Sequence, residues 1–333
     1  MPRPAQSLPV YRSADLRVVN GANMGDGLSF AADLVPDDLY ELSPLARRDR
    51  LSLHATDEGR FTVAEDTTLG TPGAQVILDS CLTFMGNDGG VTDMLLLVEV
   101  DEAGHAVEVY GLPLATMMPQ TEYHLVGVDR DAALSRLAQV ACVSFTRGTH
   151  ITMATGEQRR IEELQVGDRV LTRDDGPQEI RWIGQNTLRA VGELAPILIS
   201  AGTLNNENDL LVSPDHRLFV YQRSDALGAG RSEILVKARH LVNGDTVTVR
   251  KGGFVDYFQL LFDAHQIIYA EGIAAETLLI DPRTKPALPS ELAAKMGAGT
   301  PGHADAPLEE YEVSQRLVNH PDAAERLRRA STG

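Results

Sequence analysis

The chain of 333 residues is long enough for two domains, or for one large domain with appendages. With 43% hydrophobic and 23% charged residues, its composition is that of a folded globular protein and excludes collagen-like, low-complexity and largely disordered classes. Acidic residues number 47 and basic residues 30, so the net charge of −17 repels nucleic acid and anionic lipid headgroups, and neither is an expected partner.

The sequence gives few indications of cellular location, of disulfides or of metal sites. The apolar run Met94–Val100 falls far short of the roughly 20 residues that a membrane-spanning helix needs. The N-terminal segment lacks the apolar region of a secretory signal, so we expect a chain that is cytoplasmic or exported without a Sec signal peptide. With only Cys81 and Cys142, the sequence predicts no disulfide framework, no cysteine-rich zinc site and no cofactor, and it favours a reducing compartment.

Residues 1–140 are predicted to form a compact β-rich domain. A loose polar lead-in over 1–17 precedes short apolar runs separated by turn clusters, a pattern typical of strands. The clearest unit is a β-hairpin over 94–112, with an Asp/Gly turn between two apolar stretches. A helix closes the domain, capped by Asp129 or Asp131, and its apolar face is formed by Ala133, Leu134, Leu137 and Val140.

Residues 141–281 are predicted to form a second β-domain, because ten short apolar segments follow one another with almost no helical period. Two stretches in it, 164–176 and 241–253, align without a gap. The better explanation for this similarity is a duplicated β-subdomain with pseudo-two-fold symmetry, in which each of the two stretches begins a β-hairpin. The alternative explanation is that both stretches contain the same common β-turn motif. Residues 282–333 are rich in proline and are expected to form a tail with helices near 290–295 and 323–330.

Three sequence blocks carry the chemistry. The first is Ser144-Phe145-Thr146-Arg147-Gly148-Thr149, which continues into GDRVLTRDDG, and the second is SPDH over 213–216. The third is FQLLFDAHQIIYAEGIAAET over 258–277. Together with the internal duplication, these blocks in this order resemble the hedgehog/intein (Hint) family, in particular its bacterial intein-like members.

The resemblance implies a mostly β, pseudo-two-fold Hint fold over about 142–281, between the smaller β-domain and the helical tail. It also implies autoproteolysis, with the chain's own polypeptide as the substrate of a single-turnover reaction. The first residue of such a module attacks the preceding carbonyl, and the acyl group moves from nitrogen to oxygen or sulfur. This step needs a distorted peptide, a proton for the departing nitrogen and stabilisation of an oxyanion.

The resemblance assigns a role to each candidate residue. The attacking residue is Ser144 by its spacing to Gly-Thr or Cys142 by its greater nucleophilicity, and both assignments stay open. His216 has a pKa suited to a proton donor, and Ser213 can hydrogen-bond around the same peptide. His265 either assists the acyl chemistry or bridges strands, and the neighbouring Asp263 is a possible support for its ring.

Two departures from the family narrow the activity. Splicing needs a terminal His-Asn, but Glu276 and Thr277 occupy those positions, and Thr277 cannot cyclise as Asn does. Sterol transfer uses an Asp where Gln185 is the nearest equivalent. The sequence therefore predicts N-terminal self-cleavage without splicing. The alternative is a catalytically degenerate Hint module that serves as a structural or protein-interaction domain.

Overall fold

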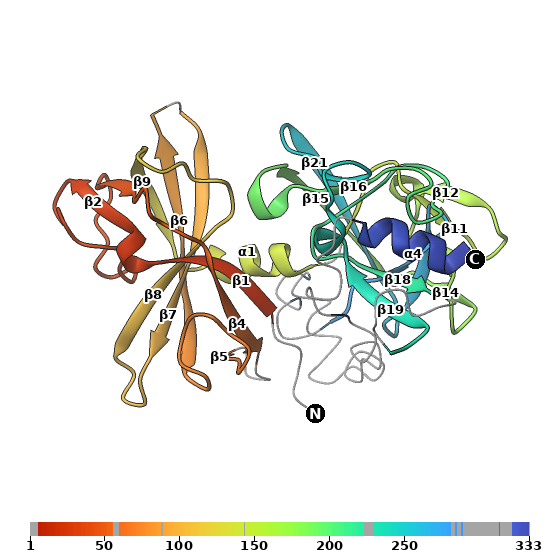
Figure 1. Cartoon of the computed structure of the whole chain (residues 1–333), viewed down its shortest axis with the longest axis horizontal. Helices are drawn as coiled ribbons and strands as arrows, with labels where there is room; N and C mark the ends of the chain where they lie inside the picture. The colour runs from red at the N-terminus through yellow and green to blue at the C-terminus, as the bar shows by residue number, and fades with distance from the viewer. Residues whose placement is uncertain are drawn as a thin grey trace. The chain divides into compact units, whose positions relative to one another are not determined.

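The computed structural model of the chain describes residues 6–55, 60–87, 89–142, 144–222, 230–280, 284, 288, 313 and 322–332 (Figure 1). Backbone contacts divide the chain into two compact units, Met1–Gln139 and Val140–Gly333. Each unit has a hydrophobic core of its own. The predicted mostly β class is confirmed in both units.

The first unit is an antiparallel sheet that closes on itself. Its nine strands pair in the order β2-β3-β9-β6-β5-β4-β1-β8-β7, and β7 also pairs with β6. The ring β6-β5-β4-β1-β8-β7 is thus complete, and closure leaves the ring without a free edge. The strands are β1 Gln6–Arg12, β2 Leu16–Asn20, β3 Leu39–Leu42, β4 Asp49–Ala55, β5 Phe61–Val63, β6 Gln75–Gly86, β7 Val91–Val100, β8 Ala106–Pro113 and β9 Glu122–Asp129.

The predicted hairpin over 94–112 is confirmed by the pairing of β7 with β8, in which Leu97 lies opposite Tyr110. The expectation of a loose lead-in over 1–17 is wrong for the residues from Gln6 onward. Strand β1 pairs with β4 and β8, and Val10 is fully buried. Polar residues dominate the segment, but its apolar residues face the core and its backbone completes the ring.

The predicted helix is α1, Ala132–Ala141. The Asp129 carboxylate accepts hydrogen bonds from the backbone N–H groups of Asp131 and Ala132, so the predicted capping by Asp129 is confirmed. Ala133 and Leu137 are buried as expected. Leu134 is 39% exposed, so its assignment to the buried face is wrong.

The second unit consists of two six-stranded sheets and one small hairpin. The first sheet has the order β15-β21-β10-β17-β16-β20, the second β12-β11-β22-β23-β18-β19, and β13 pairs with β14. The strands are β10 Phe145–Thr146, β11 His150–Thr152, β12 Gln158–Arg160, β13 Arg169–Leu171, β14 Pro177–Glu179, β15 Trp182–Arg189, β16 Ile197–Ile199, β17 Leu210–Val212, β18 Arg217–Tyr221, β19 Glu233–Lys237, β20 Val247–Val249, β21 Phe254–Leu261, β22 Ile267–Ala270 and β23 Ile273–Glu276.

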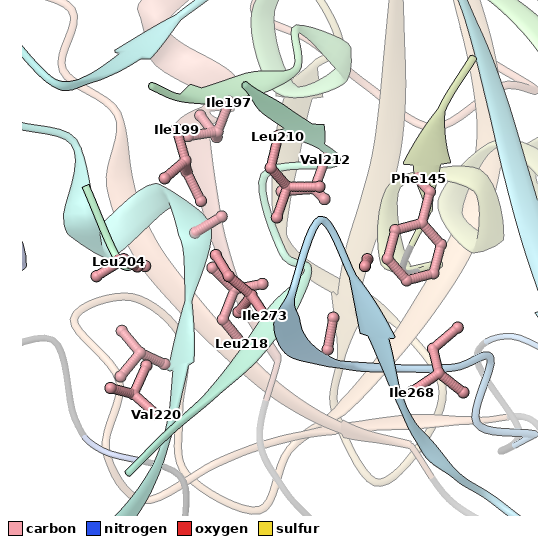
Figure 2. Close-up of a cluster of buried hydrophobic side chains, with 14 of the residues drawn as sticks. Phe145, Ile197, Ile199, Leu204, Leu210, Val212, Leu218, Val220, Ile268 and Ile273 are labelled. Atoms are coloured by element: carbon pink, nitrogen blue, oxygen red, sulfur yellow. The ribbon is translucent and has the colours of Figure 1, made fainter. Parts of the chain in front are cut away.

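Side chains from both sheets form one core (Figure 2). Phe145, Ile197 and Val212 come from the first sheet, and Leu218 and Ile268 come from the second. Burial of a large aliphatic or aromatic side chain stabilises a fold by about 1.5–3 kcal/mol, so this shared core is what holds the two sheets together. Strand β10 lies inside the first sheet, where Phe145 is opposite Val212 on one side and Phe258 on the other.

The two similar segments share a local backbone plan. A 3₁₀ turn, Ile161–Glu163, directly precedes the segment 164–176, and another, Ala238–Leu241, ends at the first residue of the segment 241–253. Each then has a glycine with positive φ, Gly167 and Gly244, before a fully buried valine. Both segments lie in the second unit. The expectation that each begins a hairpin is right for β13 and wrong for β20, because β20 pairs with β16 and the following β21 enters the middle of the sheet.

The tail contributes a helix to this core. Helix α4, Ala323–Thr332, coincides with the expected helix near 323–330, and it buries Ala323, Ala324 and Leu327 in the core of the second unit. The expected helix near 290–295 lies outside the described residues. Within the described part of the chain, no helix is long and apolar enough to cross a membrane.

Candidate functional site

Ser144 lies directly before β10 and is 3% exposed. The position follows from the sheet, because Phe145 packs into the core between two neighbouring strands and holds the residue before it in the interior. Val143, on the other side of the predicted scissile bond, lies outside the described residues. The site can therefore be built from Ser144 and the groups that contact it.

The SPDH turn, which joins β17 to β18, binds the peptide groups on both sides of Ser144. The Ser144 amide N–H donates to Ser213 Oγ at 3.0 Å, and the Ser213 amide donates to the Ser144 carbonyl at 2.9 Å. Ser213 Oγ also donates to the carbonyl of Cys142 at 3.3 Å. The structure thus brings Ser144, Ser213 and the backbone of Cys142 together.

His216 completes this arrangement from the same turn. Its Nδ1 donates to the Ser144 carbonyl at 3.1 Å, and since a carbonyl only accepts, Nδ1 carries the proton of the neutral ring. The ring lies 4.5 Å from the ring of Phe145, edge to face. Nε2 is buried and has no hydrogen-bond partner among the described residues. His216 therefore contacts the carbonyl of Ser144, and the amide nitrogen of Ser144 is bound by Ser213.

Burial decides the charge of His216. Desolvation of the fully buried ring lowers its pKa from the usual 6.5 to about 4, although the carboxylate of Glu276 and the carbonyl of Ser144 act to raise the pKa. The resting ring is neutral near pH 7, so the expectation that the pKa of His216 lies near the working pH is wrong for the folded chain, because burial disfavours the charged ring. A positive charge on it is unfavourable in this environment unless a negative group lies close by.

Gln259 also contacts Ser144, and the sequence analysis missed it. Its Nε2 donates to Ser144 Oγ at 3.2 Å, and the residue is 3% exposed. On the paired strand, Gly184 lies opposite Gln259, and a Cβ at Gly184 would meet Gln259 Oε1 at 2.7 Å. In the sequence, the one indication of a role for Gln259 is its polar side chain between the apolar residues Phe258 and Leu260.

Cys142 has a different environment from Ser144. It is fully buried in an apolar cluster with Leu261, Leu278 and Leu288. Both cysteines of the chain are free, and Cys81 lies buried in β6, where burial raises the pKa of its thiol to about 12. Packing of the Cys142 side chain among leucines is typical of a structural cysteine.

His265 lies beside a buried ion pair. Its Nε2 is 3.4 Å from Glu276 Oε2, without the geometry of a hydrogen bond. Glu276 Oε1 accepts from Arg217 Nε at 2.7 Å. Burial acts to raise the pKa of the Glu276 carboxyl, but Arg217 and His265 outweigh it and hold that pKa at about 2. Glu276 is thus an ionised group inside the protein.

The two carboxylates nearest in sequence to the site histidines have other partners. Asp215 pairs with Arg239 at 2.9 Å, and Asp263 pairs with Arg181 at 2.7 Å. The Thr277 hydroxyl donates to the carbonyl of Gln266 and accepts from its amide. Gln185 is exposed on β15. Among the residues that the structure describes, no cluster of His, Cys, Asp or Glu could hold a metal ion.

Comparisons with known proteins identify the family of the second unit. Residues 143–282 match the family model of the Hint domain. The catalytic subunit of the V-type proton ATPase of Candida tropicalis is 33% identical over 89 residues, which are 26% of this chain, and the match spans 8% of that protein.

Two solved structures are also similar over most of their own length. The Ssp DnaB mini-intein variant M86 matches 42% of this chain and 97% of its own, with 8% identity and a TM-score of 0.29. The MchDnaB-1 intein matches 40% of this chain and 98% of its own, with 13% identity and a TM-score of 0.26. From the sequence blocks and the family match, residues 143–282 of this chain are a Hint domain.

Proposed function

We propose that the Hint domain cleaves its own chain between Val143 and Ser144 through an N-to-O acyl shift. The observation that carries the proposal is the binding of the peptide groups on both sides of Ser144 by the SPDH turn. The Ser144 N–H, which belongs to the bond to be cut, is bound by Ser213, and the Ser144 carbonyl, in the next peptide, is bound by His216 and by the Ser213 amide. A residue fixed through its backbone on both sides is oriented for attack by its own side chain, which lowers the entropic part of the barrier.

The first step exchanges one bond for another. Ser144 Oγ loses its proton and forms a bond to the carbonyl carbon of Val143, while the bond from that carbon to the Ser144 nitrogen breaks. The nitrogen gains one proton and becomes a free amine. Water then attacks the ester, which leaves a carboxylic acid on Val143 and restores the Ser144 hydroxyl. The two steps together consume one water molecule.

Each contacting residue has a part in the first step. Gln259 donates to Ser144 Oγ and stabilises negative charge that develops on this oxygen. Ser213 contacts the nitrogen that departs. His216 accepts the proton that leaves Oγ and then gives a proton to the departing nitrogen, so the ring is positively charged only between the two transfers.

The surroundings of the two candidate nucleophiles favour Ser144. Its hydroxyl contacts an amide donor, its backbone N–H contacts Ser213 and its backbone carbonyl contacts His216. Cys142 packs among leucines, and its carbonyl is bound by Ser213. Removal of the Cys142 thiol is therefore expected to leave the cleavage position unchanged.

Hydroxylamine tests the proposal because it attacks esters more readily than amides. We expect it to accelerate cleavage of the wild-type chain at Val143–Ser144 and Ser144→Ala to abolish cleavage. Cys142→Ala should still be cut at the same bond. Ser80→Ala, which removes a hydroxyl from a fully buried residue in the first unit, is the matched control and should cleave as wild type does. A wild-type chain that stays intact in hydroxylamine would favour the degenerate structural or interaction module.

A further inference from the structure

Glu276 is a fully buried carboxylate next to His216 in the fold. It ends β23, which pairs antiparallel with β18 so that Ala275 lies opposite Leu218. One residue further along the register, Glu276 reaches Arg217, which directly follows His216. Its Oε1 accepts from the backbone N–H of Arg217 at 3.3 Å as well as from the guanidinium. The carboxylate therefore binds the peptide group that joins His216 to Arg217.

The negative charge of Glu276 is only partly neutralised. Arg217 contacts Oε1, whereas Oε2 faces His265 at 3.4 Å and has no hydrogen-bond partner among the described residues. Both carboxylate oxygens lie in a region without solvent, where charges interact over longer distances than in water. A neighbouring imidazolium would consequently be attracted to Glu276.

Other charged groups around His216 oppose its protonation or bind elsewhere. Arg217 carries a positive charge and opposes protonation of the ring. Asp215 is adjacent in sequence, but its carboxylate binds Arg239, which also binds Glu193 at 2.9 Å. Glu276 is the negative group whose charge acts on His216 most strongly, and its effect exceeds that of Arg217.

We propose that Glu276 is a positioning residue of the self-cleavage reaction, whose fixed negative charge stabilises the imidazolium form of His216 while a proton is transferred. This inference rests on the proposed function and deepens it. A carboxylate here acts on His216 from a distance and forms no bond to the reacting atoms. The competing role for Glu276 is purely structural, as the partner of Arg217.

The test is a nuclear magnetic resonance titration of His216 in the full chain carrying Ser144→Ala, which removes the proposed nucleophile. Glu276→Gln should lower the pKa of His216 by about one pH unit, a tenfold loss of protonated ring, because an ionised neighbour has been removed. Glu276→Asp keeps the charge and should restore most of the loss. A titration midpoint that is unchanged by Glu276→Gln would overturn the inference, as would a wild-type ring that stays neutral down to acid unfolding.

The matched control is Glu271→Gln. Glu271 is also a buried carboxylate of the β22–β23 hairpin, but it binds His150 and Asn208. Its removal should leave the pKa of His216 in place. If Glu276→Gln does not fold, a double variant with Arg217→Met and Glu276→Leu removes both buried charges, which proteins tolerate better than the loss of one partner. The double variant should also lower the pKa of His216.

Cleavage in the background with Ser144 intact separates the two proposals. If the chain cleaves, Glu276→Gln should slow it about tenfold at pH 7. If the wild-type chain never cleaves, the proposed function fails. The titration of His216 in that case still decides whether Glu276 controls the charge of the ring.

Discussion

Ser144 is held through its backbone N–H and its backbone carbonyl, which belong to the peptide units before and after it, and the amide of Gln259 contacts its hydroxyl. This distribution suits a reaction in which the residue attacks the peptide bond on its own N-terminal side, because the nucleophile and the leaving nitrogen belong to one residue. Each neighbouring side chain contacts a different group of Ser144: Ser213 contacts the nitrogen, His216 the carbonyl and Gln259 the hydroxyl.

Gln259 gives the first residue-scale prediction. Gln259→Met keeps the side-chain volume and removes the donor to Ser144 Oγ. A hydrogen bond to a charged group is worth about 1.5–3 kcal/mol, so cleavage should slow by roughly 10–100-fold. Gln266→Met, which alters another buried glutamine whose amide binds Asp175, is the control. Gel densitometry over time measures the cleavage rates of both variants. Equal rates would show that Gln259 takes no part in the reaction.

His216 also makes stability depend on pH. Its pKa of about 4 in the folded chain lies below the usual 6.5, so the unfolded chain binds the proton more readily. Stability from the neutral ring is complete above pH 6.5 and is lost as the pH falls toward 4. Between pH 6.5 and pH 4, we expect the free energy of unfolding of wild type to fall by about 3 kcal/mol more than that of His216→Gln.

Denaturant unfolding followed by fluorescence measures this loss, because the single tryptophan, Trp182, reports on the Hint domain. His105→Gln, at an exposed position in the first unit, is the control and should follow the wild-type profile. Parallel profiles for wild type and His216→Gln would contradict a buried neutral ring.

Contiguous motifs made part of this site predictable. Ser144 and the SPDH turn each occupy a few residues, so the order of the blocks is enough to select them. Gln259 and Arg217 act through strand register, since each reaches its partner only because particular strands are neighbours in a sheet. The sequence marks Glu276 only as a departure from the family pattern. Its ionised state depends on contacts with Arg217, on the neighbouring strand β18, and with His265, and these contacts form only in the folded chain.

At the scale of elements, a short 3₁₀ helix fixes the SPDH turn. In this helix, Ala238–Leu241, the amide of Ala238 donates to the His216 carbonyl and the amide of Arg239 donates to the Pro214 carbonyl. The Arg239 guanidinium joins Asp215 to Glu193. The turn that carries His216 is thus bound through its backbone and through one charged side chain.

Arg239→Met should therefore slow cleavage by about 10–100-fold through misplacement of His216. Arg239→Lys should recover only part of the rate, because an ammonium group lacks the planar fork that binds two carboxylates at once. Arg181→Met removes an exposed ion pair with Asp263 and should leave the rate unchanged. The rates come from the same densitometry, and a wild-type rate for Arg239→Met would show that the backbone contacts suffice.

The elements themselves were largely predictable where the pattern was local. Alternating apolar residues and turn glycines indicated the 94–112 hairpin and the ten strand segments of the second domain. Strand β1 was missed because its polar residues mask an alternation that only its partners, β4 and β8, make meaningful. The partner of β20 was missed for the same reason: the turn sequence is local, but its neighbour β16 precedes it by many residues.

At the scale of the whole molecule, two units with separate cores follow one another along the chain, and Ser144 lies shortly after the boundary at Val140. Cleavage at this position would release residues 1–143 with the first unit complete. On the C-terminal side, the Thr277 hydroxyl is bound to the backbone of Gln266 and Glu276 is paired with Arg217. Neither residue offers the side-chain amide that cyclises in splicing, so a single cut is expected.

The most direct test of self-cleavage is the intact mass of the purified, incubated full-length chain, with N-terminal sequencing of the larger fragment. Self-cleavage predicts two species, residues 1–143 and 144–333, whose masses add up to that of the chain plus one water molecule, with Ser144 at the new N-terminus. A single uncleaved species, a fragment that begins at Cys142, or a product cut after Thr277 would contradict it.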